Sequence, residues 1–158
     1  MLNVMEVILA LKGTALFRNV PGEGLKRLSD FIQEKKVSAA EQIFREGDLG
    51  DEMYIVRLGR VSLHHDVGGA PALIEMVEPG GYFGEMAIID DLPRSAGATA
   101  DVDTSLLVLH KNDFRTAVLD YPDIAFEIFR EFTRRLRRSD QRYRELLEQA
   151  RGLGLEPR

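Results

Sequence analysis

Apolar residues repeat at helical spacing in the first part of the chain. Steps of three and four residues, which place side chains on one face of a helix, occur in two groups: Val4, Val7, Ile8 and Leu11, then Leu25, Leu28, Phe31 and Ile32. The turn-forming residues 19–22 separate the groups, and Pro21 disfavours a helical residue before it. We therefore predict an N-terminal helical segment over residues 1–35.

The pattern changes between residues 36 and 110. Short runs in which apolar and polar residues alternate cover residues 53–58, 61–65, 72–77 and 104–110, and glycine-rich turns separate them. Alternation with period two is typical of strands with one buried face. Many short strands joined by such turns indicate a jelly-roll-like β-roll. The predicted fold is mainly β (α+β): a jelly-roll-like β-roll flanked in sequence by N-terminal helices and a long C-terminal helix.

Helical spacing returns over residues 111–158. Asn112 or Asp113 is placed to cap a short helix ending near Asp120, and Pro122 suits the first turn of a long helix that reaches Gly152. Along that long helix, residues recur in an a/d heptad pattern: Phe129, Phe132, Leu136, Ser139, Tyr143, Leu146 and Ala150. The pattern indicates either a stripe docked on the β-section or a helix–helix interface, which makes a homodimer through this helix a candidate assembly.

Composition narrows the class of protein. The 158 residues are 44% apolar and 30% charged, as in a globular domain, and contain no cysteine. Without a basic N-terminal region or an apolar run of about 20 residues, we expect no signal peptide, no membrane span and a cytoplasmic location. Residues 1–110 hold 10 Lys and Arg against 17 Asp and Glu, a balance of −7. Such an acidic body predicts no direct DNA binding by this chain.

The segment 83–96 carries the most specific chemistry. Gly84 allows close approach of the backbone to a ligand, and the helix start that follows favours an anion such as phosphate. Arg94 offers a guanidinium fork for two phosphate oxygens, Ser95 a hydroxyl, and Glu85 an acceptor suited to sugar hydroxyls. Residue types alone also fit an ordinary salt-bridged corner of a β-structure.

The order of residues in this segment resembles the phosphate-binding cassette of the cyclic-nucleotide-binding domain family. The resemblance rests on Phe83, Gly84, Glu85 and Ala87, followed after five residues by Pro93, Arg94, Ser95 and Ala96. It extends to residues 44–61, with glycines at 47 and 59, and to residues 16–21. The family includes kinase regulatory subunits, cyclic-nucleotide-gated channels and the bacterial catabolite activator.

The resemblance implies a role for each cassette residue. The ligand-binding set it gives is Phe83, Gly84, Glu85, Met86, Ala87, Arg94, Ser95 and Ala96. Within it, Glu85 accepts from the ribose 2′-hydroxyl, the Gly84 and Ala87 amides face the ribose and the phosphate, and Arg94 pairs with the phosphate. The C-terminal helix supplies a lid, for which Arg134, Arg135 and Arg138 are candidates. The expected ligand is cyclic AMP, with cyclic GMP as the alternative, and no further cofactor.

The expected function is therefore a non-enzymatic sensor that passes ligand binding to its C-terminal helix, and thence to an unknown effector protein or tethered domain. Two alternatives stay open: a fragment of a catabolite-activator-type transcription factor, and a regulatory domain of a channel, transporter or enzyme. No nucleophile motif or acid–base pair predicts a catalytic site. His64 and His65 are adjacent in a strand and point to opposite faces, so they predict no metal site.

Overall fold

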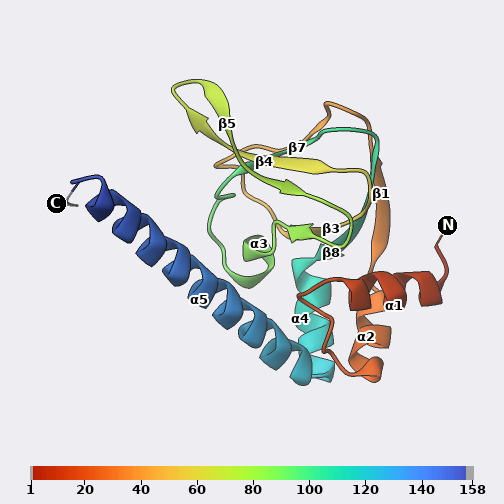
Figure 1. Cartoon of the computed structure of the whole chain (residues 1–158). Coiled ribbons are helices and arrows are strands. Elements are labelled where there is room, and N and C mark those ends of the chain that lie inside the picture. Colours follow the sequence, from red (N-terminus) through yellow and green to blue (C-terminus); the bar gives the residue numbers. More distant parts are fainter. Residues whose placement is uncertain (1, 156–158) are drawn as a thin grey trace.

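The computed structural model describes residues 2–155 and shows a β-roll with helices on one side of it (Figure 1). Residues 1 and 156–158, at the ends of the predicted terminal segments, lie outside the described residues. Helices α1 (Val4–Gly13) and α2 (Gly22–Ser29) precede the roll, and α4 (Lys111–Asp120) and α5 (Asp123–Gly152) follow it. A single turn of helix, α3 (Met86–Ile89), interrupts the strands.

Both N-terminal helices are confirmed, but the helical segment ends earlier than predicted. Asn3 caps α1 by accepting from the Glu6 amide at 3.0 Å, while the Glu6 carboxylate accepts from the Asn3 amide at 2.8 Å. Helix α2 stops at Ser29, and residues 33–35 belong to strand β1 (Gln33–Val37), which pairs with β8. The helical prediction is wrong for those three residues, because pairing with β8 overrides their local pattern.

Within residues 2–155, eight strands form two antiparallel four-stranded sheets. One sheet has the order β1-β8-β3-β6 and the other β2-β7-β4-β5. The strands not yet given are β2 (Gln42–Phe44), β3 (Glu52–Leu58), β4 (Val61–Val67), β5 (Ala70–Val77), β6 (Tyr82–Phe83), β7 (Gly97–Ala100) and β8 (Thr104–His110). The β-roll prediction is confirmed, and each of the four predicted runs lies within one of these strands.

Strand β3 shows why the chain has two apolar cores. Met53 and Ile55 face the helices and join a core with Leu11, Leu25 and Ile124, among others. Their neighbours Tyr54 and Val56 face the opposite way and join the core between the two sheets. Because side chains alternate along a strand, one strand serves both cores. The β1-β8-β3-β6 sheet is therefore covered on both faces, which explains the unbroken run of buried residues over the first six positions of β8.

The C-terminal helices lie close to their predicted ranges. Helix α4 begins at Lys111 with His110 in the cap position and no side-chain cap, so neither Asn112 nor Asp113 caps it. Helix α5 packs its first turns on the helical core through Ile124, Ile128 and Phe132. It then runs past the roll, with its C-terminal end on the side of the β4–β5 hairpin (Figure 1).

Most of the heptad pattern on α5 is not docked on the β-section. Phe129, Leu136, Tyr143 and Leu146 are each between 57% and 63% exposed, and of the bulky heptad residues Phe132 alone packs against the described core. The docked-stripe interpretation is thus wrong for these four side chains. Among the described residues, no helix is long and apolar enough to cross a membrane.

Candidate functional site

A sharp turn places the cassette between the roll and α5. Strand β6 ends at Phe83, Gly84 takes a positive φ of 73°, and α3 begins at Met86. A Cβ on Gly84 would lie 2.7 Å from Nη1 of Arg94 and 3.2 Å from the Glu52 carbonyl oxygen. Glycine is needed here both for the left-handed backbone and for the close approach of Arg94.

The guanidinium of Arg94 lies under the cassette turn with its charge unpaired. The residue is only 8% exposed, and Nη1 donates to the Gly84 carbonyl at 3.1 Å. Its carbon Cζ lies 4.1 Å from the centroid of the Phe44 ring, a cation–π contact. Within residues 2–155 no carboxylate lies within 4.0 Å of it, and its buried Nε has no hydrogen-bond partner. Burial lowers the pKa of Arg94, as expected when a charge leaves water.

The surroundings hold Arg94 in this position. Its amide donates to the Asp48 carbonyl and its carbonyl accepts from the Gly47 amide, both at 2.8 Å. A Cβ on Gly50 would lie 2.4 Å from Nε of Arg94, so that side of the guanidinium also needs a glycine. Tyr54, stacked on Phe83 with ring centroids 5.1 Å apart, completes the aromatic shelf with Phe44. The sequence reasoning missed this shelf, since β2 and β3 are distant from the cassette in sequence.

The other charged residue of the cassette, Glu85, already has a partner. Its carboxylate is buried, and Oε1 accepts from Nη1 of Arg135 on α5 at 2.5 Å. The same Nη1 donates to the Tyr82 hydroxyl at 3.3 Å. Burial disfavours the charge on Arg135, but the Glu85 carboxylate outweighs this and raises the pKa of Arg135. Of the three candidate lid arginines, Arg135 is thus the one that contacts the cassette, and Arg134 and Arg138 instead bind Glu131.

The remaining predicted site residues occupy different environments. Phe83 is buried in the core between the sheets, where it supports Tyr54. The Ala87 amide donates to the Gly84 carbonyl at 3.2 Å. Ser95 is exposed, and its hydroxyl donates to the Met86 sulfur at 3.7 Å. Met86 is exposed and Ala96 half-buried beside them. All eight residues therefore lie in the segment from the end of β6 through α3 to the start of β7, and Phe83 is buried beneath it.

The two acidic residues of the cassette, Asp90 and Asp91, make contacts with Lys111 and Leu92 and none with Arg94. Nζ of Lys111 donates to the Asp90 carbonyl and to Oδ1 of Asp91, each at 2.5 Å. This ion pair and hydrogen bond lower the pKa of Asp91. Asp90 accepts from the Leu92 amide at 3.1 Å. Lys111 therefore anchors the variable part of the cassette to the start of α4.

Comparison with known proteins identifies the family of this chain. A family model described as "Cyclic nucleotide-binding domain" matches residues 34–121. The chain belongs to this family. As a cyclic nucleotide-binding domain it is similar to the Cyclic AMP receptor protein of Thermus thermophilus, with 34% identity over 131 residues, 82% of this chain and 61% of the relative.

Solved structures show the same fold in relatives of this domain. The crystal structure of the Thermus thermophilus Catabolite Activator Protein has a TM-score of 0.75 and 31% identity, and the match covers 84% of this chain and 63% of that one. The regulatory domain of Toxoplasma gondii PKA with cAMP has a TM-score of 0.69 and 30% identity, covering 74% and 45%. The chain spans about three fifths of the length of the curated bacterial receptors that it matches.

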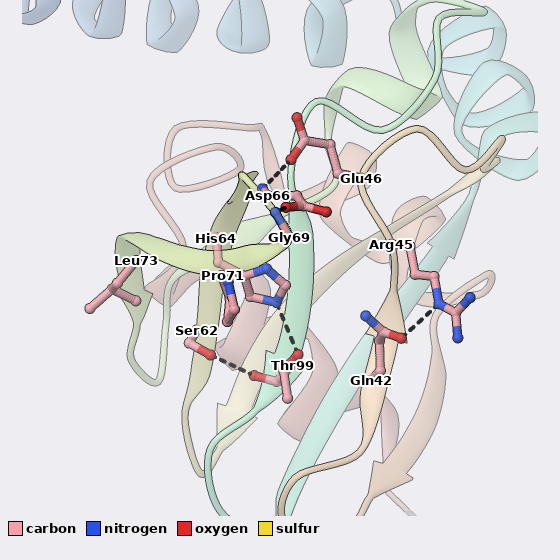
Figure 2. Close-up of a pocket in the computed structure, with 10 residues that line it drawn as sticks. All are labelled: Gln42, Arg45, Glu46, Ser62, His64, Asp66, Gly69, Pro71, Leu73 and Thr99. Atoms are coloured by element: carbon pink, nitrogen blue, oxygen red, sulfur yellow. Dashed lines mark hydrogen bonds between the residues drawn. The ribbon is translucent and has the colours of Figure 1, made fainter.

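A separate pocket of about 620 Å³ lies on the face of the β2-β7-β4-β5 sheet that carries Ser62, His64 and Thr99 (Figure 2). His64 Nε2 lies 3.1 Å from the Thr99 hydroxyl, and Arg45 Nε donates to Gln42 at 2.9 Å. No cassette residue lines this pocket, so it is distinct from the site around Arg94. Among the described residues, no group of three or more His, Asp or Glu side chains is placed to hold a metal ion.

Proposed function

We propose that this cyclic nucleotide-binding domain binds cyclic AMP and acts as a non-enzymatic sensor. The observation that carries the proposal is the buried guanidinium of Arg94, which has no carboxylate partner within residues 2–155. An unpaired buried charge is costly, so such groups usually face a counter-charge. A singly charged cyclic phosphate supplies that counter-charge and accepts from the free Nε and Nη2 donors.

The remaining cassette residues define the rest of the ligand. Glu85 accepts from the ribose 2′-hydroxyl through Oε2, the carboxylate oxygen that Arg135 leaves free. The exposed Ser95 hydroxyl lies next to Arg94 in sequence and assists with the phosphate. Gly84 supplies an amide without a side chain in the way, and Met86, Ala87 and Ala96 form the surface around them. The Ala87 amide must release the Gly84 carbonyl to reach the phosphate.

Helix α5 transmits the binding signal in this proposal. The Glu85–Arg135 ion pair is a direct link between the cassette and the long helix. A ribose that shares the Glu85 carboxylate changes the strength of this link, and a ligand shifts a conformational equilibrium only through such differences between states. The position of α5 is then the output, passed to an effector protein or to a domain joined to this one.

The choice of cyclic AMP over cyclic GMP follows the relatives. The bacterial receptor is named for cyclic AMP and the kinase regulatory domain was solved with it, while a cGMP-dependent protein kinase that is 30% identical over 117 residues keeps cyclic GMP as the alternative. Ser95 is compatible with either base. Titration calorimetry of both nucleotides on ligand-free protein tests the proposal, with micromolar or tighter binding expected for cyclic AMP and much weaker binding for 5′-AMP. The absence of heat with either cyclic nucleotide at millimolar concentration would overturn it.

The relatives also suggest which kind of regulator this domain serves. Because a relative that is 28% identical over 144 residues is named a CRP-like cAMP-activated global transcriptional regulator, we infer that the domain serves a catabolite-activator-type regulator. A regulatory role in a channel, transporter or enzyme is the alternative. Expression of the intact gene product and its binding to promoter DNA, with and without cyclic AMP, distinguishes the two.

A homodimer through α5 fits this context. Phe129, Leu136, Tyr143 and Leu146 form an exposed apolar stripe, which a second copy of the helix would cover. Light scattering at tens of micromolar is expected to give twice the 17.8 kDa of one chain. Leu136→Glu and Leu146→Glu should each return the mass to that of one chain, because a carboxylate cannot be buried in the stripe. A monomeric wild-type protein would contradict the dimer.

A further inference from the structure

A second pocket, lined mainly by arginines, lies on the face of α5 opposite the exposed apolar stripe. Its volume is about 460 Å³, which is within the usual range for small-molecule sites. The lining comes from two parts of the chain, the connector between α1 and α2 and the middle of α5: Ala15, Arg18, Asn19, Glu131, Arg134, Arg137 and Arg138. None of these residues belongs to the cassette.

The charge of this pocket differs from that of the chain. Four arginines against one glutamate leave three positive charges, whereas the whole chain carries −5. The glutamate is buried and binds two of the arginines from below: Oε2 of Glu131 accepts from Nε of Arg134 at 3.1 Å, and Oε1 from Nη2 of Arg138 at 3.3 Å. Each of these guanidinium groups has five N–H donors, so most of their donors stay free.

The other two arginines have no carboxylate of their own. Within residues 2–155, neither Arg18 nor Arg137 lies within 4.0 Å of a carboxylate oxygen. Four guanidinium groups around one carboxylate leave a local excess of positive charge, which water partly screens because Arg134 and Arg138 are 50% and 70% exposed. The pocket therefore presents an excess of donors and positive charge toward its open side.

The walls of the pocket are held in place by the helical core. Leu16, Phe17 and Val20 of the connector are almost fully buried, while Arg18 and Asn19 between them point outward. The connector is also tied by backbone hydrogen bonds, from the Phe17 amide to Thr14 and from the Val20 amide to Phe17. On the other wall, Ile128 anchors α5 in the same core. A site on fixed elements loses little entropy when a ligand binds.

From these observations we infer that this pocket is a second ligand site, which binds a free, phosphate-bearing molecule with at least two negative charges. Guanidinium forks match phosphate oxygens in pairs, and several of them together favour a doubly charged group over a singly charged one. A concave pocket of this volume suits a small molecule. A bound phosphate would join the 14–20 connector to α5, and so fix the helix that the proposed function uses as its output.

The test uses pyrophosphate as the probe and titration calorimetry on the full chain at about 0.15 M salt, where weak surface attraction is screened. One pyrophosphate per chain is expected. The double variant Arg18→Gln/Arg137→Gln should weaken binding by about tenfold or more, since each lost guanidinium removes a charge-assisted contact. These two arginines make no ion pair in the structure, so the variant should remain folded.

Two controls separate this site from other sources of binding. Arg144→Gln removes an arginine from the same face of α5, about two turns beyond Arg137, and should leave the affinity unchanged. Arg94→Gln, titrated in the absence of cyclic nucleotide, should also leave pyrophosphate binding intact, which keeps the result independent of the proposed cassette function. Equal affinity in the double variant and wild type, or loss of binding in Arg94→Gln, would overturn the inference.

The same titration tests the class of ligand. A hexaglutamate peptide and inorganic phosphate serve as competitors of pyrophosphate in the wild-type protein. Weak displacement by both, with stronger displacement by a nucleoside diphosphate, supports a phosphorylated small molecule. Displacement by hexaglutamate at lower concentrations than by any phosphate would overturn that class in favour of an acidic protein segment.

Discussion

The two charged side chains of the cassette, Arg94 and Glu85, have different surroundings. At the Arg94 end, the guanidinium is held by aromatic rings and backbone, without a carboxylate among the described residues. At the Glu85 end, the carboxylate is bound at 2.5 Å by Arg135 from a different element. In the proposed function, Arg94 would accept an anion without first losing a partner, whereas Glu85 would share its carboxylate between Arg135 and the ligand. Affinity should therefore depend mainly on Arg94, and communication with α5 mainly on Glu85 and Arg135.

The largest expected effect is on the Arg94 end. Arg94→Gln should weaken cyclic AMP binding by about 100-fold or more, because a buried phosphate would lose its charge partner. The thermal unfolding midpoint without ligand should stay the same or rise, since a buried unpaired charge is removed. Calorimetry and a thermal melt measure the two quantities. Arg45→Gln, an exposed arginine at the end of β2, serves as the matched control.

A marked fall in the midpoint of ligand-free Arg94→Gln would instead show that Arg94 is a structural residue. In that case the comparison between the two ends would fail, because both would be stabilised internally.

The next effect concerns the Glu85 carboxylate. Glu85→Gln keeps the size of the side chain but weakens its acceptance from a ribose hydroxyl, so binding should fall by about tenfold. The loss should disappear for the 2′-deoxy form of cyclic AMP, which lacks the donor that Glu85 is proposed to bind. An equal loss with both nucleotides would mean that Glu85 acts on the fold of the cassette instead.

The smallest change in affinity is expected for Arg135. Arg135→Gln removes the link to α5 but frees Oε1 of Glu85, so affinity for cyclic AMP should change by less than about tenfold. Hydrogen–deuterium exchange over α5 should then respond less to cyclic AMP than in the wild-type protein. Arg142→Gln on the same helix is the control. Full retention of the α5 response in Arg135→Gln would show that the signal takes another route.

The apolar pattern predicted most of the helices and strands, because the spacing of apolar residues differs between a helix and a strand. The helical repeat of Val7 and Leu11 survives in the structure, whereas β3 is buried on both faces instead of the one face that its alternation predicted. The helical prediction failed for residues 33–35 because their pairing with β8, some 70 residues later in the chain, decides their conformation. The division of the chain into residues 1–35, 36–110 and 111–158 stays a prediction, as does the ligand role of each cassette residue.

The sequence by itself determined the order of residues in the cassette, including the glycine that the turn at position 84 requires. Its local spacing is enough to place Glu85 and Arg94 in one short segment, since nine positions separate them. Only the tertiary structure decided what surrounds them. Phe44 of β2 covers Arg94, and Arg135 of α5 reaches Glu85, across 50 residues each. Such contacts depend on how sheets and helices pack, and periodicity carries no information about packing between distant segments.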